Sequence, residues 1–145
     1  MRILHVLDHS IPLHSGYAFR TRAILEHQRA RGWETFHLTT PRHTAPGPAV
    51  ETVEGLEFHR TSRPHGIAMR FPVSRERAEM RATTRRLAEV VHAVRPDVIH
   101  AHSPILTAIP ALRVGRAAGI PVVYEIRAFW EDAPASHGSC REGDL

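Results

Sequence analysis

Short apolar runs alternate with stretches of helical periodicity along the chain. Residues 2–8 form an apolar run that contains His5 and ends at Asp8, a pattern typical of a strand buried on both faces of a parallel sheet. Residues 17–31 then carry apolar side chains at helical spacing and are followed by Gly32, a helix stop. This order predicts a parallel strand followed by a crossover helix.

The same alternation continues as far as residue 126. Gly55 indicates a turn or a short hairpin that leads into a strand. A long helix is expected after Ser74, which we interpret as its N-cap. The remaining expected elements are strands at 33–39, 56–60, 97–101 and 121–126, and helices ending at 94 and at 118. Strands that alternate with helices predict an α/β fold, a Rossmann-like open parallel sheet flanked by helices, and the 145 residues suffice for one domain.

Composition supports a globular domain. Hydrophobic residues make up 42% of the chain and charged residues 23%, and no apolar run approaches the ~20 residues that cross a bilayer. The N-terminal run lacks the uncharged apolar region and cleavage site of a secretory signal, so we expect a cytoplasmic protein. The single cysteine, Cys140, excludes an internal disulfide.

The net charge of +4 comes partly from arginines between residues 75 and 86. Acidic residues are interleaved with them, as on a solvated helix face. Such a face can still attract anionic partners, and peripheral contact with the inner face of the membrane stays open. No stacking aromatic residues accompany the arginines, so we expect no nucleic-acid partner.

A ligand site is expected at the carboxyl ends of the strands at 2–8 and 97–101, where the strand order of such sheets reverses. Polar residues are concentrated in the loops that follow both strands. Gly16 begins the first helix, where free N–H groups favour a phosphate, although a turn glycine needed only for positive φ explains it equally well. The dinucleotide fingerprint G-x-G-x-x-G is absent, which argues against an NAD-binding domain.

Two pairs of polar residues lie near the expected edge of the sheet. His100 and His102 share one side of their strand, and His102, at the strand end, is the better placed to reach a ligand. His100 is interpreted as a hydrogen-bonded core histidine. A metal site that His100 and His102 share with His5 is disfavoured, because no acidic or cysteine ligand accompanies them, so no metal is expected. Glu125 and Arg127 form either a salt bridge that steadies the loop or part of a substrate site.

Two parts of the sequence resemble family 4 glycosyltransferases. They are the opening run Met1–Asp8 with Ser15-Gly16-Tyr17, and the stretch Arg95-Pro96-Asp97-Val98-Ile99-His100-Ala101-His102. The segment 123–132, V-Y-E-I-R-A-F-W-E-D, is similar to a branch found with exosortase-linked exopolysaccharide systems. The resemblance extends over essentially the whole chain.

The resemblance implies one half of a GT-B fold, with this chain as the N-terminal, acceptor-side domain over residues 1–145. The C-terminal donor-binding domain, with its diphosphate clamp and E-x7-E motif, is not among these residues. The implied reaction transfers a sugar, with retention, from a UDP- or GDP-type nucleotide sugar to a glycan or lipid-linked acceptor. The family needs no metal or other cofactor.

The resemblance also implies roles for residues. Ser15 and Gly16 would contact the donor phosphates, and His102 would be catalytic by contacting the transferred sugar. His100, Glu125 and Arg127 would bind substrate. The isolated domain would be inactive because half of the catalytic cleft is missing. The alternative is a non-enzymatic binding module of flavodoxin or receiver type, although a receiver needs an acidic cluster after the first strand and only Asp8 is present there.

Overall fold

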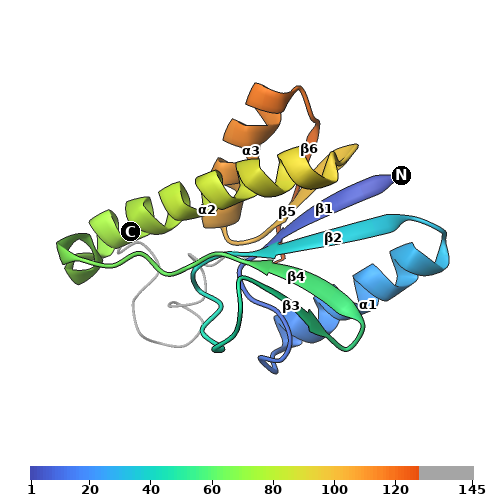
Figure 1. Cartoon of the computed structure of the whole chain (residues 1–145), viewed down its shortest axis with the longest axis horizontal. Helices are drawn as coiled ribbons and strands as arrows, with labels where there is room; N and C mark the ends of the chain where they lie inside the picture. The colour runs from blue at the N-terminus through green and yellow to red at the C-terminus, as the bar shows by residue number, and fades with distance from the viewer. Residues whose placement is uncertain (128–145) are drawn as a thin grey trace, which may run out of the picture.

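A computed structural model of the chain describes residues 1–127 and contains one six-stranded sheet (Figure 1). The strand order is β3-β4-β2-β1-β5-β6, and every neighbouring pair is parallel except β3 and β4. The strands are β1 (Arg2–Leu7), β2 (Glu34–Thr39), β3 (Val50–Val53), β4 (Leu56–Arg60), β5 (Val98–His102) and β6 (Val122–Glu125). The predicted Rossmann-like α/β class is confirmed, and so is the predicted hairpin, which is β3–β4.

The helices cover opposite faces of the sheet. Helix α1 (Gly16–Ala30) lies on one face, while α2 (Pro72–Val94) and α3 (Ile105–Ala118) pack together on the other (Figure 1). Because side chains alternate along a strand, Leu4 and Val6 of β1 join the apolar cluster under α2 and α3, whereas Leu7 joins the cluster under α1. His5 therefore also faces α1.

The helix ends follow the sequence signals in most places. The Ser15 hydroxyl caps α1 by accepting a hydrogen bond from the Ala18 N–H at 3.1 Å. Gly32 and Gly119 follow α1 and α3 with φ of +78° and +68°, the left-handed conformation in which glycine ends a helix. The positions of Gly32 and Gly119 as helix stops are confirmed.

The start of α2 differs from the prediction. The helix begins at Pro72, and its N-cap is Phe71, so Ser74 lies inside the first turn. The Ser74 hydroxyl donates to the carbonyl oxygens of Ala68 and Phe71 instead of capping the helix. Proline favours the first helical position because its φ is preset and its missing N–H has no helical partner there. The loop before it contains a short 3-10 helix, η1 (Ile67–Arg70), which the sequence pattern did not predict.

Within residues 1–127, no helix combines the length and apolar character required to cross a membrane. The residues from 128 onward, including Cys140 and the second half of the segment 123–132, lie outside the described part of the chain.

Candidate functional site

The carboxyl ends of β1 and β5 meet at one edge of the sheet, as predicted. The two strands are neighbours, and the chain leaves β1 toward α1 on one face but leaves β5 toward α3 on the other. This is the point at which the winding of the sheet reverses, where open α/β sheets bind ligands.

Four histidines form a layer between the sheet and α1. The strand register places His5 opposite both His37 and His100, and His102 lies two residues further along β5. The centre of the His5 ring lies 6.1 Å from that of the His37 ring, 5.0 Å from that of His100 and 5.1 Å from that of His102. The prediction that His100 and His102 share one side is confirmed, since their rings are stacked at 4.1 Å.

His102 is buried and hydrogen-bonded at both ring nitrogens. Arg127, which can only donate, contacts Nδ1 through its guanidinium group. His102 Nε2 lies 2.8 Å from Nδ1 of His5, and His5 Nε2 lies 2.9 Å from the side-chain oxygen of Gln28. A continuous chain of polar contacts thus joins Arg127, just after β6, to the last turn of α1.

The exposure of the two β5 histidines is the reverse of the prediction. The His102 side chain is 0% exposed, whereas that of His100 is 17% exposed. The reason is tertiary: Glu125 and Arg127, at the end of β6, lie over His102. The expectation that His102 is the more accessible of the pair is therefore wrong for this structure.

These imidazoles are neutral near pH 7. Burial lowers the pKa of His102 to about 4, and the neighbouring charges of His100 and Arg127 act in the same direction, against the effect of Glu125. Burial, followed by the other histidines, lowers the pKa of His5 well below its ordinary value of 6.5. Burial also lowers the pKa of His100.

Glu125 and Arg127 form the salt bridge that the sequence suggested. Arg127 Nε donates to Glu125 Oε1 at 3.2 Å, and Arg20 of α1 donates to the same oxygen at 3.0 Å. Glu125 Oε2 lies 3.0 Å from His102 Nδ1, and this contact and the Arg127 charge hold the pKa of the carboxyl group below its ordinary range. Arg127 also donates to the hydroxyl of Thr21 at 2.7 Å, so the pair fastens β6 to α1.

The first loop is ordered by a second polar chain. His9 lies between Asp8 and Ser15, with Nδ1 3.3 Å from Asp8 Oδ2 and Nε2 2.7 Å from the Ser15 hydroxyl. The ring of Tyr17 stacks on His9 at 4.7 Å, and its hydroxyl accepts a hydrogen bond from the backbone N–H of Asp8. These contacts hold Ser15 at the start of α1.

Nothing in the described part of the chain requires a glycine at position 16. It is exposed, it is not among the glycines with positive φ, and a Cβ atom added there would meet no atom within 4 Å. The interpretation that Gly16 is needed only for a left-handed turn is therefore wrong.

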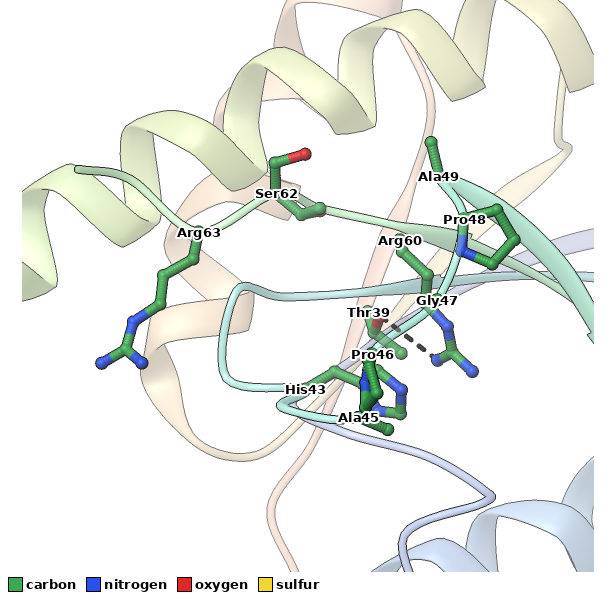
Figure 2. A pocket seen from close by; sticks show the side chains of 11 residues that line it. Thr39, His43, Ala45, Pro46, Gly47, Pro48, Ala49, Arg60, Ser62 and Arg63 are labelled. Carbon is green, nitrogen blue, oxygen red and sulfur yellow. Dashed lines mark hydrogen bonds between the residues drawn. The ribbon is translucent and has the colours of Figure 1, made fainter.

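A separate polar cavity of about 190 Å³ lies at the carboxyl ends of β2 and β4 (Figure 2). Arg60 donates to Thr39 at its wall, and its charge is balanced by Glu51, whose Oε1 lies 2.7 Å from Arg60 Nε. Burial lowers the pKa of His43, also in the wall, to about 4. Figure 2 shows the Arg63 side chain directed away from Arg60 and His43.

Three histidines come close enough to consider a metal ion. One nitrogen of each of His5, His100 and His102 lies within 4.8 Å of the others. However, the stacked rings of His100 and His102 direct their lone pairs along nearly parallel planes, and the Arg127 cation contacts His102. This arrangement suits a hydrogen-bonded chain better than tetrahedral coordination. That no metal is needed stays a prediction.

Sequence reasoning missed several members of the site. It considered His5 only as a metal ligand, and it did not identify Gln28, His9 or Arg20 as partners of the predicted residues. The helical spacing of α1 contained a usable signal, because Arg20 and Gln28 are polar residues on a helix that has to cover the sheet.

The fold and the site define a Rossmann-like α/β domain with a glycine at the N-terminus of α1 and a buried histidine layer beneath that helix. The chain belongs to the family of glycosyl transferase 4-like domains, whose model matches residues 15–142. This family membership confirms the resemblance to family 4 glycosyltransferases, while the similarity to the exosortase-linked branch stays a prediction. A comparison with curated proteins found no match.

Solved structures share the fold. Sucrose-phosphate synthase from Thermosynechococcus elongatus is 13% identical with a TM-score of 0.67, over 98% of this chain and 36% of that protein. MurG from Acinetobacter baumannii is 14% identical with a TM-score of 0.57, over 94% and 38%. UDP-GlcNAc 2-epimerase from Neisseria meningitidis, solved with UDP-GlcNAc, is 14% identical with a TM-score of 0.58, over 86% and 31%. The chain thus spans about a third of the length of these structures.

Proposed function

We propose that this domain is the N-terminal, acceptor-side half of a retaining glycosyltransferase. The full enzyme would move a sugar from a UDP- or GDP-type nucleotide sugar to a glycan or lipid-linked acceptor in the synthesis of exopolysaccharide or cell envelope. Family membership supports the reaction class, and the similarity to MurG and sucrose-phosphate synthase supports the fold. A C-terminal domain of the same protein would hold the nucleotide.

Gly16 is the observation that carries this proposal. Neither backbone conformation nor crowding requires glycine there, and we propose that the approach of a ligand is the reason for it. The first N–H groups of α1 have no helical partner, and the helix dipole favours negative charge at that end. We infer that the donor diphosphate meets the N-terminus of α1, with the Ser15 hydroxyl held beside it by His9.

The histidine layer would serve the transferred sugar. His102 is the proposed catalytic residue, and contact with substrate requires the side chains of Glu125 and Arg127 to give way, because the ring is buried. His100 is the part of the layer that reaches the surface, and it would bind substrate together with Glu125 and Arg127. Neutral imidazoles can orient sugar hydroxyl groups without repelling developing positive charge at the reacting carbon.

The polar cavity in Figure 2 opens at the same edge of the sheet, and we propose it as part of the acceptor side. Its walls offer the hydroxyl and guanidinium groups that bind sugar hydroxyls.

The test uses the natural protein that carries this chain, assayed for nucleotide release from UDP- and GDP-sugars in the presence of an acceptor extract. Gly16→Val should raise the KM for the donor at least tenfold, because the added methyl groups stand where the phosphates approach. Ala23→Val, at an exposed position of the same helix, is the matched control and should leave KM unchanged. Equal donor KM values for wild type and Gly16→Val would remove Gly16 from the donor site. Absence of transfer from any donor would overturn the proposed reaction.

A further inference from the structure

The surface at the N-terminal end of α2 carries exposed apolar side chains. Ile67 in η1 is 74% exposed, Phe71 at the N-cap is 64% exposed, and Val73 in the first turn is 61% exposed. We call residues 63–77 the α2 tip. The buried residues of α2 begin only at Glu79, so the first seven residues of the helix contribute nothing to the core. In Figure 1 this green end of α2 extends beyond the sheet.

The α2 tip is also basic. It contains four arginines and a single acidic residue, Glu76. Within residues 1–127, no ion pair or side-chain hydrogen bond joins any of these arginines to another residue. The four are Arg63, Arg70, Arg75 and Arg77. The α2 tip therefore presents unpaired guanidinium groups, which can bind anions, beside exposed apolar side chains, which can enter an apolar environment.

Two of these arginines line a cleft beside the tip. Arg63 and Arg75 share a cavity of about 290 Å³ with Arg42, which follows β2. Arg42 has an acidic partner, since its Nε lies 3.3 Å from Glu79 Oε2. Arg63 and Arg75 have no such partner among residues 1–127, so the cleft keeps a positive charge. Planar guanidinium groups bind phosphate oxygens well.

We propose that the α2 tip docks the domain on an anionic phospholipid membrane. Ile67, Phe71 and Val73 enter the boundary between headgroups and acyl chains, while Arg63 and Arg75 bind lipid phosphates. Apolar side chains flanked by arginines are the combination that holds a segment at this boundary, and the attraction depends on anionic lipid. Charge complementarity selects the membrane over an apolar protein partner.

The docked surface lies at the same edge of the sheet as the candidate site, because Arg42 and Arg63 follow the carboxyl ends of β2 and β4. The edge proposed to receive the acceptor would thereby face lipid. This inference does not rest on the proposed transfer reaction, since its test measures membrane binding alone and its failure leaves the reaction open.

The test is co-sedimentation of the full chain with vesicles of phosphatidylcholine, alone or with 30% phosphatidylglycerol. Binding is expected to the anionic vesicles and to weaken with salt, because exposed charges are screened. Arg63→Gln combined with Arg75→Gln should lower the partition coefficient about 25-fold, about fivefold for each arginine. The matched control, Arg113→Gln with Arg116→Gln, removes two exposed arginines of α3 and should lower it much less.

The apolar part of the α2 tip is tested separately. Ile67→Ser combined with Phe71→Ser should abolish binding that survives in 0.5 M salt, while Leu112→Ser, at an exposed apolar position of α3, should not. Circular dichroism of each variant checks that it is folded. If the double serine variant is unfolded, Phe71→Trp replaces it, and lipids brominated in their acyl chains should quench its fluorescence more than that of wild type.

Three results would overturn the proposal. They are absence of wild-type binding to anionic vesicles at low salt, equal losses in the α2 and α3 arginine variants, and no added quenching of Phe71→Trp. A second copy of the chain or another domain as the true occupant would give the first of these results.

Discussion

Acid should destabilise this domain through its buried histidines, and His37 allows the effect to be measured. Its Nδ1–H donates to the carbonyl of Glu57 at 2.7 Å, and its Nε2 accepts from the Thr35 hydroxyl at 2.9 Å. A carbonyl cannot donate, so the neutral tautomer is fixed. Burial lowers the pKa of His37 to about 4, and the Arg29 charge acts in the same direction, against the hydrogen bond to Glu57.

Whether acid raises or lowers stability depends on how many protons the folded and unfolded states bind. The unfolded chain protonates His37 near its ordinary pKa of 6.5, whereas the folded chain protonates it only near 4. The stability that this histidine contributes is therefore complete above pH 6.5, and it is lost as the pH falls from 6.5 toward 4. Between pH 7 and pH 4.5 this difference removes about 2–3 kcal/mol from the free energy of unfolding. His5 and His102 act in the same direction.

The perturbation is His37→Asn, whose side-chain amide can still donate to the Glu57 carbonyl but does not titrate. Urea unfolding, followed by circular dichroism at pH 7 and pH 4.5, gives the loss of stability on acidification for each protein. The loss should be about 2–3 kcal/mol smaller in His37→Asn than in wild type. His65→Asn, at an exposed position, is the control and should behave as wild type. An identical loss in His37→Asn and wild type would show that protonation of His37 does not destabilise the folded domain.

Two further predictions concern packing and charge. Gly115→Ala should destabilise the domain by about 1–3 kcal/mol in urea unfolding. The new methyl group would lie 2.8 Å from a backbone carbonyl oxygen and against a β6 valine. Gly16→Ala is the control and should cost nothing measurable, because the space around Gly16 is open. Arg60→Met should lower the free energy of unfolding by about 2–4 kcal/mol, because it leaves the partly buried carboxylate of Glu51 without its cation. Arg63→Met, which breaks no ion pair, should leave the urea midpoint unchanged, and equal midpoints for the Arg60 and Arg63 variants would contradict this account.

The elements that sequence could predict are those specified locally. A run of apolar residues defines β1, and glycine marks the ends of α1 and α3, because these signals act within a few residues. The pairing of β1 with β5 followed from the general topology of such sheets. The start of α2 was misplaced because both Pro72 and Ser74 are suitable residues at a helix N-terminus, and only the structure shows that the proline occupies the first position.

The site was harder to predict because its contacts join distant segments. The bond between Arg127 and His102 spans 25 residues, and that between His102 and His5 spans 97. No periodic pattern records which side chains meet across β1, β5 and β6. The burial of His102 results from these contacts, and for that reason the strand pattern predicted the wrong member of the β5 pair as the accessible one.

The histidine layer has a consequence for the assembly of the sheet. His5, His37 and His100 occupy matched positions on three adjacent strands, and each has a polar partner there: Gln28 for His5, the Glu57 carbonyl for His37 and Glu125 for His100. A slip of one residue in β1 would turn His5 into the apolar cluster beneath α2 and α3, where an imidazole has no partner and its desolvation is uncompensated. The residues that bring polar groups into the domain therefore penalise a one-residue misalignment of its central strands.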